Sequence, residues 1–343
     1  MTPRPLQTAV MLIGILLAAT LVSMLVPPAL QRTVTETLIK VVVVIGLYIF
    51  VGNSGIFSFG HVAFMSLGAY GSALLTLAPA RKDALLDLPP WLESLQLPWP
   101  VAMILVTMAV GLVALVFGLL IGKLRGIAPA MATFALLMVV HVVASNWQGV
   151  TGGRQALVGL PRFVNLWVAY GAAAIAILIA SAYAMTGHSL LLRASRENEV
   201  AASATGVDIG RERLIAFVIS AMVMAAGGIL YAHFVGTITA NIFYLDMTFV
   251  TLTMLVVGGS RSLTGAVVGV VMISAVSELL RSVERGIDLV GTTLSAPPGL
   301  QEIVLSVLLL TILILRPLGL LGNSELGWSR PANRAATAFK EDN

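Results

Sequence analysis

The sequence contains no cysteine and has little charge of either sign. The absence of cysteine excludes disulfides, thiolate metal sites and cysteine nucleophiles. Charged residues make up 10% of the 343 positions, whereas hydrophobic residues make up 58% and the mean hydropathy is +0.97. Soluble domains average about 25% charged and about 45–50% apolar residues, so this composition excludes a water-soluble enzyme. It also excludes a disordered chain, because disorder requires low hydrophobicity.

Apolar residues gather in ten runs along the chain. The runs are residues 8–26, 37–51, 56–78, 99–121, 127–146, 166–186, 214–236, 247–258, 264–282 and 300–316. Because a transmembrane helix needs about 20 apolar residues, they predict an all-α integral membrane protein with eight to ten transmembrane helices. The runs 37–51 and 247–258 are short for a complete crossing. We assign residues 1–317 to the membrane domain and residues 318–343 to a polar cytoplasmic tail.

Positively charged residues indicate the orientation of these helices. With ten spans, both termini lie on the side that carries residues 187–213, and this side has twelve Lys and Arg residues against seven on the other. Cytoplasmic loops are richer in Lys and Arg, so we place both termini in the cytoplasm. The net charge of +4 reflects these loops, and we expect no nucleic-acid partner. Lys40 falls inside a span, from which we expect its amine to extend to an interface.

Two apolar segments are interrupted by glycine and polar residues. Residues 51–71 read VGNSGIFSFGHVAFMSLGAYG, and residues 257–270 read VGGSRSLTGAVVGV. Unpaired backbone groups at membrane depth are tolerated only against protein or a wet cavity. Paired glycine-broken segments are therefore typical of a transporter's substrate pathway. The alternative interpretation is close packing, because small residues allow helices to approach each other.

The segment 187–213 is too polar to cross a bilayer. We expect Ser195 to cap a short helix that ends at Gly206, and Asp208 to cap a second helix that leads into the next span. The mixed charges of the first helix suit a polar protein surface better than anionic lipid. The segment is therefore either a docking surface for another protein or an ordinary solvated connector.

The ionisable residues within the apolar runs show no metal-binding pattern. We expect His141 and His233 to form hydrogen bonds between helices, and Glu278 to pair with Arg281 near a helix end. The sequence has no HExxH motif and no cluster of carboxylates in a span. We therefore expect neither a metal nor another cofactor.

Six stretches of the sequence resemble, in family order, ABC-transporter permeases of the branched-chain amino acid type, specifically their LivM-like branch. They are GNSGIFSFGHVAFMSLGAYG (52–71), RGIAPAMATFALLMVV (125–140), TGGRQALVGLPR (151–162), SLLLRASRENEVAASATGVDIGRERLIAFVISAMVMAAGGILYAHFVG (189–236), LVVGGSRSLTGAVVGV (255–270) and PPGLQEIVLSVLLLTILILRPLGLLG (297–322). The stretch 189–236 is the most specific, because a polar loop and the following span match together. Arg261 stands where the family usually has glycine, and Gly265-Ala266 where it has Gly-Pro.

The resemblance implies the permease subunit of an ATP-driven importer that moves branched-chain or related hydrophobic amino acids into the cytoplasm. A LivH-like second permease, two cytoplasmic ATPase subunits and a periplasmic substrate-binding protein would complete the importer in the bacterial inner membrane. The chain itself would not be an enzyme, because it has no nucleotide-binding motif. The stretch most similar to a Walker motif, residues 118–124 (GLLIGKL), lacks the full spacing before the Gly-Lys pair and the Ser or Thr after it. Urea, short amides and other amino acids are alternative substrates.

Two sets of candidate site residues follow. The ATPase-docking residues are Arg193, Arg196, Glu197, Glu199, Ala201, Ala202 and Gly206. The substrate-pathway residues are Asn53, Ser54, Phe57, Ser58, Gly60, His61, Thr151, Gly152, Gly153, Gly258 and Gly259. Backbone groups of broken helices can hold the ammonium and carboxylate of a zwitterion without a buried charge.

A function of another class is suggested by two short glycine patterns. Residues 52–55 fit the GxSG motif of rhomboid-type intramembrane serine proteases, and residues 228–236 fit their GxxxAHxxG motif. Ser54 and His233 would then form an acylating dyad if they lay within hydrogen-bond reach. The predicted topology places them at opposite faces of the membrane, which favours the permease.

Overall fold

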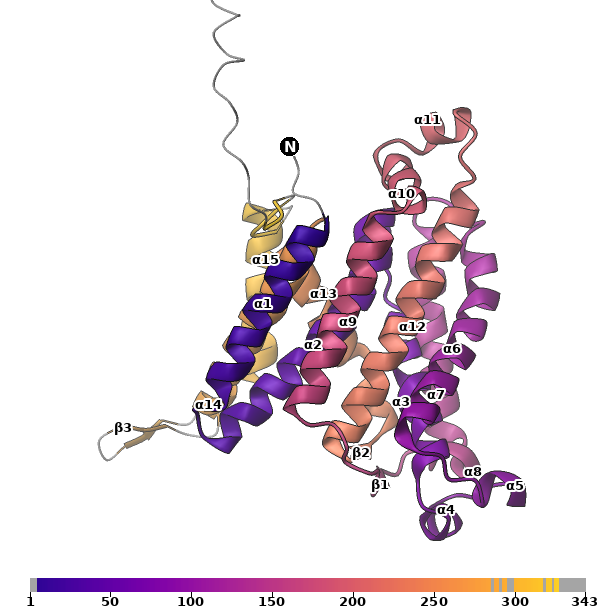
Figure 1. The fold of residues 1–343 in the computed structure, drawn as a ribbon, viewed down its shortest axis with the longest axis vertical. Coiled ribbons are helices and arrows are strands. Elements are labelled where there is room, and N and C mark those ends of the chain that lie inside the picture. Colours follow the sequence, from indigo (N-terminus) through magenta and orange to yellow (C-terminus); the bar gives the residue numbers. More distant parts are fainter. Residues whose placement is uncertain are drawn as a thin grey trace, which may run out of the picture.

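The computed structural model describes residues 5–284, 287–289, 292–294, 299–316, 319–322 and 324–326, which form an all-α fold (Figure 1). Its long helices are α1 (Pro5–Ser23), α2 (Pro28–Ser54), α3 (His61–Thr76), α6 (Trp99–Ile121), α7 (Ala128–Asn146), α9 (Leu166–Ala184), α12 (Ile209–Val235), α13 (Leu245–Gly258), α14 (Leu263–Glu284) and α15 (Leu300–Leu315). The connections contain α4 (Pro79–Leu85), α5 (Pro90–Glu93), α8 (Gln148–Thr151), α10 (Gly187–Glu197), α11 (Glu199–Ala204) and η1 (Ala240–Phe243). Two small antiparallel pairs join β1 (Leu157–Val158) to β2 (Thr237–Ile238) and β3 (Ile287–Leu289) to β4 (Thr292–Leu294).

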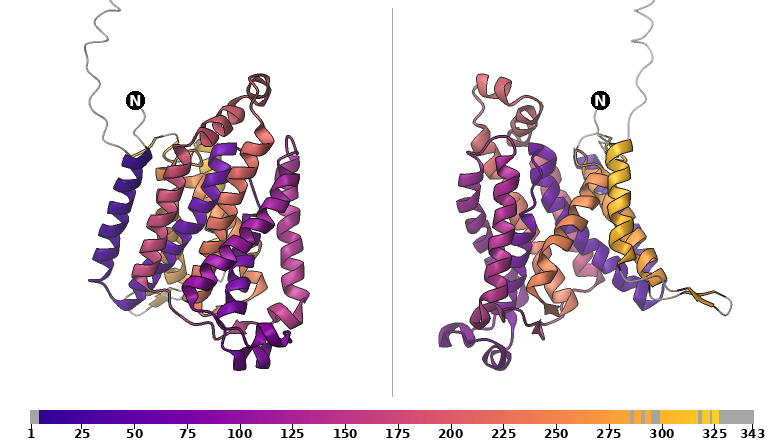
Figure 2. Two further views of the ribbon diagram at one scale, coloured as in Figure 1. Left: turned by 45° about the vertical axis from the view of Figure 1, so that its right-hand side comes forward. Right: turned by 180° about the vertical axis from the view of Figure 1, so that it is seen from behind.

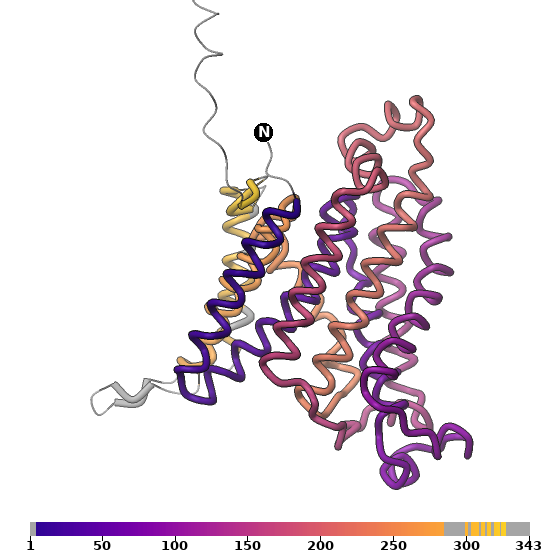
Figure 3. Tube along the Cα trace, in the orientation of Figure 1, coloured from indigo at the N-terminus to yellow at the C-terminus, as the bar shows by residue number. Residues whose placement is uncertain are grey.

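The long helices run back and forth between two ends of a bundle (Figures 1 and 3). Helices α10 and α11 project from one end, here named the α10 end, and the views in Figure 2 show the same projection. Helices α4, α5 and α8 lie at the opposite end, here named the α4 end. The first residues of α1 and the last residues of α15 both lie at the α10 end, as the ten-span topology predicts.

Eight helical segments in the described ranges are long and apolar enough to cross a membrane. They are α1, α2, α6, α7, α9, α12, η1 together with α13, and α14. Helices α3 and α15 have 16 residues each, and α3 turns by 119° into α4. These ten helices correspond to the ten apolar runs, and the prediction of an all-α, multi-span membrane protein is confirmed.

Helix α2 differs from its prediction. It extends over 27 residues, so the expectation of a short crossing at 37–51 is wrong. Pro28 is tolerated in the first turn, where its missing N–H has no helical acceptor. Glu36 and Lys40 form an ion pair of 2.7 Å, and this pairing lets the helix continue beyond its apolar run. The Lys40 amine therefore meets a carboxylate one turn nearer the start of α2, and its extension to a membrane interface stays a prediction.

Helices α2 and α12 form the centre of the bundle, where α12 packs against α2, α3 and α6. Glycine permits the closest of these crossings. A Cβ atom on Gly228 of α12 would lie 2.0 Å from the carbonyl oxygen of Met65 on α3. On α3, a Cβ atom on Gly68 would lie 2.3 Å from the carbonyl oxygen of Ala225. The two backbones therefore touch directly, as small residues allow in membrane helices.

The α4 end is closed by the short helices between α3 and α6. Lys82 of α4 is fully buried, and its Nζ atom donates hydrogen bonds to the carbonyl oxygens of Leu92, at 2.9 Å, and Leu95. Burial lowers the pKa of the Lys82 amine. The lysine thereby fixes α4 against α5 and the chain that follows it.

Candidate functional site

Helix α10 is joined to the end of α2 by hydrogen bonds around Asn53. The Asn53 Oδ1 atom accepts from Arg193 Nε at 2.7 Å and from Ser189 Oγ at 3.2 Å, while its Nδ2 atom donates to Ile49 O at 2.8 Å. Asn53 is buried, with 1% of its surface exposed. Because a buried charge-assisted bond is both directional and strong, Asn53 fixes α10 against the end of α2.

Arg196 provides a second connection between the same two helices. Its Nη1 atom donates to the Gly52 carbonyl oxygen at 2.5 Å, and its Nη2 atom lies 3.0 Å from Glu197 Oε1. Gly55, with φ of +72°, ends α2 and lies against the Arg196 side chain. Arg261, on the turn between α13 and α14, lies 3.6 Å from the same Glu197 oxygen. The α10 helix therefore contacts both glycine-broken turns.

Helix α11 is held on α12 by an ion pair of 3.1 Å between Nη2 of the buried Arg213 and Oε2 of Glu199, whose side chain is 36% exposed. Asn198 caps α11 by accepting from the Ala201 backbone N–H at 2.9 Å, so the expectation that Ser195 is the cap is wrong. Ser195 lies inside α10, where its hydroxyl donates to Leu192 O at 2.8 Å. An asparagine side chain competes for backbone donors and so breaks the helix there.

Two other expectations for segment 187–213, the turn at Gly206 and the cap at Asp208, are confirmed. Gly206, with φ of +86°, lies in the turn after α11. Asp208 caps α12 through a bond of 3.2 Å from the Arg211 backbone N–H, and α12 continues as the next span. Ala202 faces inward and is buried, whereas Ala201 is exposed. One face of α11 is therefore used for attachment and the other is exposed.

The turn between α13 and α14 is covered by the segment after α15, here named the C-terminal strap (residues 319–322 and 324–326). The backbone N–H of Leu320 donates to Val257 O at 2.9 Å, and that of Leu321 donates to Gly258 O at 3.1 Å. A Cβ atom on Gly319 would lie 2.6 Å from the Gly259 Cα atom. The carbonyl groups of Val257 and Gly258 at this glycine-broken turn are thus paired by protein.

Glu325 of the strap caps the first turn of α14. Its two carboxylate oxygens accept from the backbone N–H of Leu263 at 2.8 Å and of Thr264 at 3.1 Å. The Thr264 hydroxyl also donates to Glu325, at 2.7 Å. A carboxylate at this position satisfies free N–H groups and complements the helix dipole. The strap therefore belongs with the helices, although we predicted a tail from 318; residues 327–343 lie outside the described ranges.

Replacing Glu325 with alanine should lower the melting temperature of the purified protein. The loss of a helix cap costs about 1–2 kcal/mol, and α14 would lose two of its capping acceptors. E325Q keeps one carbonyl oxygen and should recover part of the loss. A thermal-shift measurement in detergent checks this order, and an E325A protein as stable as the wild type would contradict it.

The pathway candidates around the α2–α3 turn lie at the α10 end, close to α10. Ser54 Oγ donates to Phe50 O at 2.7 Å, whereas Phe57 is exposed. Ser58 Oγ lies 2.5 Å from His61 Nδ1, and both residues are buried. The imidazole is packed among the rings of Phe50, Phe64 and Phe217, and its Nε2 atom has no hydrogen-bond partner. Gly60 touches the Thr133 backbone of α7.

The pathway candidates of the TGG turn lie at the other end of the bundle. Thr151 Oγ1 donates to Ala144 O at 2.7 Å, and the glycines that follow have φ of +75° and +63°. Gly152 lines a polar cavity of about 600 Å³ at the α4 end, with Leu85, Ser145, Asn146, Gln148, Arg154 and Gln155. The structure therefore separates Gly152 and Gly153 from Asn53, and the eleven candidates do not form a single site. A role for any of them in substrate contact stays a prediction.

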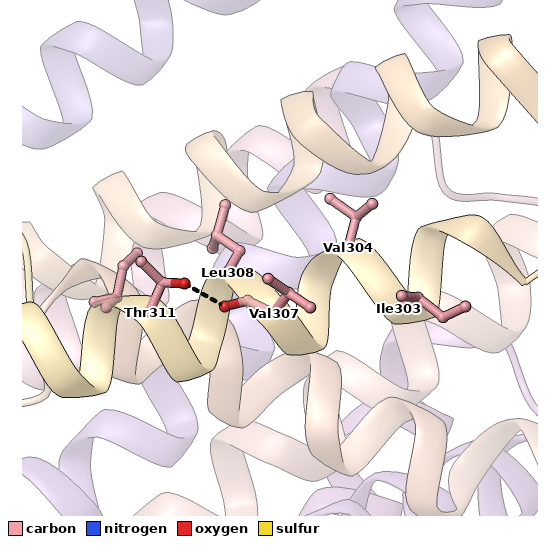
Figure 4. Close-up of a pocket in the computed structure, with 6 residues that line it drawn as sticks. Ile303, Val304, Val307, Leu308 and Thr311 are labelled. Carbon is pink, nitrogen blue, oxygen red and sulfur yellow. Dashed lines mark hydrogen bonds between the residues drawn. The ribbon is translucent and has the colours of Figure 1, made fainter.

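A groove of about 460 Å³ lies along α15 and offers little to a polar ligand (Figure 4). It is lined by Ile303, Val304, Val307, Leu308, Thr311 and Ile312. The Thr311 hydroxyl donates to Val307 O within the same helix, at 2.8 Å. This groove is an apolar surface of the kind that lipid covers. In the part of the chain that the structure describes, no three His, Asp or Glu side chains gather closely enough to hold a metal ion.

The histidines in the apolar helices differ from each other. His233 Nδ1 bonds to Pro161 O at 2.9 Å and Nε2 to Ser72 Oγ at 3.2 Å, so the expected helix-to-helix bonding is confirmed. His141 instead stacks on Tyr244 at 3.8 Å, and its Nδ1 atom has no partner, so the same expectation is wrong there. Ser54 ends α2 at the α10 end, whereas His233 lies in the last turn of α12 at the other end, so they form no protease dyad.

Three residues that carry this geometry were not among the sequence candidates: Ser189, Arg213 and Glu325. Ser189 is four residues from Arg193, so helical spacing would have placed both on one face of α10. Arg213 is five residues after the Asp208 cap, and the sequence gave no indication that it pairs with α11. Glu325 caps a helix 61 residues earlier in the chain, a distance over which no local pattern operates.

Comparisons with known proteins agree with the resemblance. The family model described as "Branched-chain amino acid transport system / permease component" matches residues 29–313. A probable branched-chain amino acid transport permease protein LivM of Methanocaldococcus jannaschii is 31% identical over 160 residues, which are 46% of each chain. High-affinity branched-chain amino acid transport system permease proteins LivM of Salmonella typhimurium and Escherichia coli are 26% and 25% identical over 288 residues.

The matches to the two bacterial relatives cover 72% of this chain and 62% of each relative. The chain thus spans about half to three-fifths of the length of the curated relatives it matches. No solved structure matches the chain. The family model nevertheless covers most of the 343 residues and nearly all of the long helices. The protein therefore belongs to the family of branched-chain amino acid transport permease components.

Proposed function

We propose that the protein is the membrane-spanning permease subunit of an ATP-driven importer for branched-chain amino acids. It works with a LivH-like second permease, two cytoplasmic ATPase subunits and a periplasmic substrate-binding protein. The α10 end faces the cytoplasm of a bacterial cell, and the α4 end faces the periplasm on the other side of the inner membrane. The resemblance to ABC permeases supports this assembly, and the names of the relatives support the substrate class.

The observation that carries the proposal is the attachment and exposure of α10 and α11. Both helices project beyond the bundle (Figures 1 and 2), and hydrogen bonds tie them to α2 and α12. On the free side, 79% of Val200 is exposed, and Leu190 and Leu191 are exposed as well. An apolar surface on a firmly attached polar segment suits a protein partner better than water. We assign this surface to the ATPase subunits.

Force from the ATPases would reach the membrane through three helices. A movement of α10 and α11 acts on α9 and α12, which continue directly from them along the chain. It also acts on α2, because Arg193 and Arg196 hold the end of that helix. ATP binding then favours one of two arrangements of the bundle over the other. The permease changes from an outward-open to an inward-open state.

Replacing Gly206 with valine should uncouple ATP hydrolysis from uptake. A β-branched residue is strained at φ of +86°, so the turn that positions α11 would change. Glu199→Lys should act similarly, because it places a second cation beside Arg213. We expect at least a tenfold fall in uptake per ATP hydrolysed, measured in proteoliposomes that contain the full complex.

The matched control for this experiment is Gly187→Ala, because Gly187 is on the same segment and has no atom within 4 Å of a Cβ position. This variant should keep wild-type coupling. Competition for uptake by leucine, isoleucine, valine and urea identifies the substrate. Uptake of urea alone would overturn the proposed substrate, and wild-type coupling in an assembled G206V complex would overturn the docking surface.

A further inference from the structure

Polar side chains of α9, α10 and α12 meet at the α10 end of the bundle, beside the bonds around Asn53 (Figure 1). His188 is the second residue of α10, and Glu212 lies in the first turn of α12. The His188 Nδ1 atom lies 2.8 Å from the Glu212 Oε2 atom. The two residues are 24 positions apart in the chain, so this pair fastens the beginning of α10 to the beginning of α12.

Glu212 is a buried carboxylate that depends on this contact. Its side chain is 7% exposed, whereas that of His188 is 44% exposed. Among the hydrogen bonds of the described residues, His188 is the side chain that bonds the Glu212 carboxylate. The burial of a carboxylate is costly unless the group is paired. The contact with His188 therefore stabilises the arrangement of the two helices.

Two further side chains share the surroundings of Glu212. In the part of the chain that the structure describes, the Tyr183 hydroxyl of α9 is buried without a hydrogen-bond partner. This tyrosine interacts electrostatically with both Glu212 and Arg193. The Arg193 Nε atom is already bonded to Asn53. Glu212 thus has one fixed cation in its neighbourhood and one direct partner, the half-exposed imidazole.

The groups around His188 differ in the pH at which they change charge. Helix α10 packs against α2, α9, α11 and α12. Besides Glu212, the titratable and charged side chains of these elements at the α10 end are Tyr48, Tyr183, Glu199, Asp208, Arg211 and Arg213, and α10 itself carries Arg193, Arg196 and Glu197. Carboxyl groups ordinarily titrate near about pH 4, tyrosine near about pH 10 and arginine above about pH 12. Imidazole is the side chain of this set whose ordinary charge change falls between about pH 5 and about pH 8.

The neighbouring attachment of the same segment does not share this sensitivity. Arg213 follows Glu212 on α12 and pairs with Glu199 of α11 at 3.1 Å. A guanidinium stays protonated at every physiological pH. An imidazole that loses its proton also loses the charge assistance that roughly doubles the strength of a hydrogen bond. A rise in pH therefore loosens α10 on α12 while α11 stays attached.

We propose that His188 and Glu212 are positioning residues that form a protonation-dependent latch between α10 and α12. At about pH 6 the charged imidazolium bonds the carboxylate, and α10 moves together with α12. As the pH rises, the bond weakens and part of each movement of α10 is no longer passed to α12. Acidification of the compartment at the α10 end therefore strengthens coupling. This inference rests on the function proposed above.

The latch itself is measured on the full chain in nanodiscs, without transport. Because the chain has no cysteine, Leu190→Cys, at a position that is 60% exposed on α10, provides a single site for a nitroxide spin label. We expect the mobile fraction of the spectrum to rise at least twofold from about pH 6 to about pH 8. His188→Gln and Glu212→Gln cannot form the charged pair, so the mobile fraction should be high at both pH values.

Transport provides the second measurement. The ratio of leucine uptake to ATP hydrolysis is determined in proteoliposomes that contain the full complex, with the pH varied on the side that receives ATP. We expect the wild-type ratio to fall at least threefold from about pH 6 to about pH 8. His188→Gln should stay at the lower value throughout, and His188→Arg, a permanent cation, should stay at the higher value.

The matched control is Gly187→Ala, which changes the residue before His188. No atom lies within 4 Å of a Cβ position on Gly187, so this variant should keep the wild-type pH profile. A contact with a merely structural role would lower the coupling ratio of His188→Gln without flattening its pH profile.

Three results would overturn the inference. They are a spin-label mobility that does not change with pH in the otherwise wild-type chain, a wild-type pH profile in His188→Gln, and a coupling ratio of His188→Arg that equals that of His188→Gln. If the wild-type complex takes up no leucine at any pH, the proposed function fails instead. The spin-label measurement still decides the latch in that case, so the two failures are distinguishable.

Discussion

A transporter that carries Asn53→Ala should hydrolyse ATP while its uptake falls at least tenfold. Asn53 is the acceptor through which Arg193 and Ser189 hold α2 to α10. Removal of one partner of a buried, charge-assisted hydrogen bond costs about 1.5–3 kcal/mol, which is comparable with the gap between two transport states. ATP hydrolysis and uptake measured on the same proteoliposomes give the coupling ratio.

The control for Asn53 is an asparagine with a purely local role. Asn165 caps α9 through a bond of 3.0 Å from the Val168 backbone N–H, so Asn165→Ala should cost about 1 kcal/mol of stability and leave coupling unchanged. Arg193→Ala removes the other partner and should resemble Asn53→Ala. Normal coupling in both Asn53→Ala and Arg193→Ala would refute transmission through α2.

Replacement of Gly228 with alanine should destabilise the bundle severely. The added methyl group would lie 2.0 Å from the Met65 carbonyl oxygen, and α12 would have to move away from α3 over the whole crossing. Overpacking of this kind typically costs about 1–3 kcal/mol and sometimes more. The contact is with the Met65 backbone, which cannot move aside as the end of a flexible side chain can. We therefore expect a loss of stability of at least about 3 kcal/mol. Denaturation in detergent and the yield of folded protein measure the effect.

Two other helical glycines provide a matched comparison. No atom lies within 4 Å of a Cβ position on Gly14 of α1 or Gly171 of α9. Alanine at either position should be neutral or stabilise the helix by up to about 1 kcal/mol, because alanine has the higher helix propensity. If Gly228→Ala is as well tolerated as Gly14→Ala, the direct contact between α3 and α12 is refuted.

The sequence predicted the helices well because hydrophobic length is a local property. Every apolar run corresponds to a helix, and Asp208 caps α12 as its position before an apolar run predicts. The wrong predictions concern helix ends, where polar side chains form hydrogen bonds or ion pairs that a hydropathy pattern cannot predict. Glu36 and Lys40 pair inside α2 and extend it, and Asn198 takes the capping role expected of Ser195.

The candidate site was predicted less completely, because it is assembled from distant segments. The motif around Asn53 was recognised, but its partners are 136 and 140 residues away on α10. The sequence left open whether each glycine allows close packing or breaks a helix, and the structure distinguishes these roles. Gly258 and Gly269 allow α13 and α14 to touch, whereas Gly206 sets a turn. Only three-dimensional neighbours distinguish these roles.

The C-terminal strap has a consequence for biosynthesis. Its residues leave the ribosome after every helix of the bundle has been made, yet they cap α14 and pair with the turn after α13. A nascent chain can therefore be inserted in the lipid with this hairpin still unfinished. Translation that stops short of Glu325 would yield an embedded but incompletely closed polypeptide, which membrane proteases could discriminate from the full-length product.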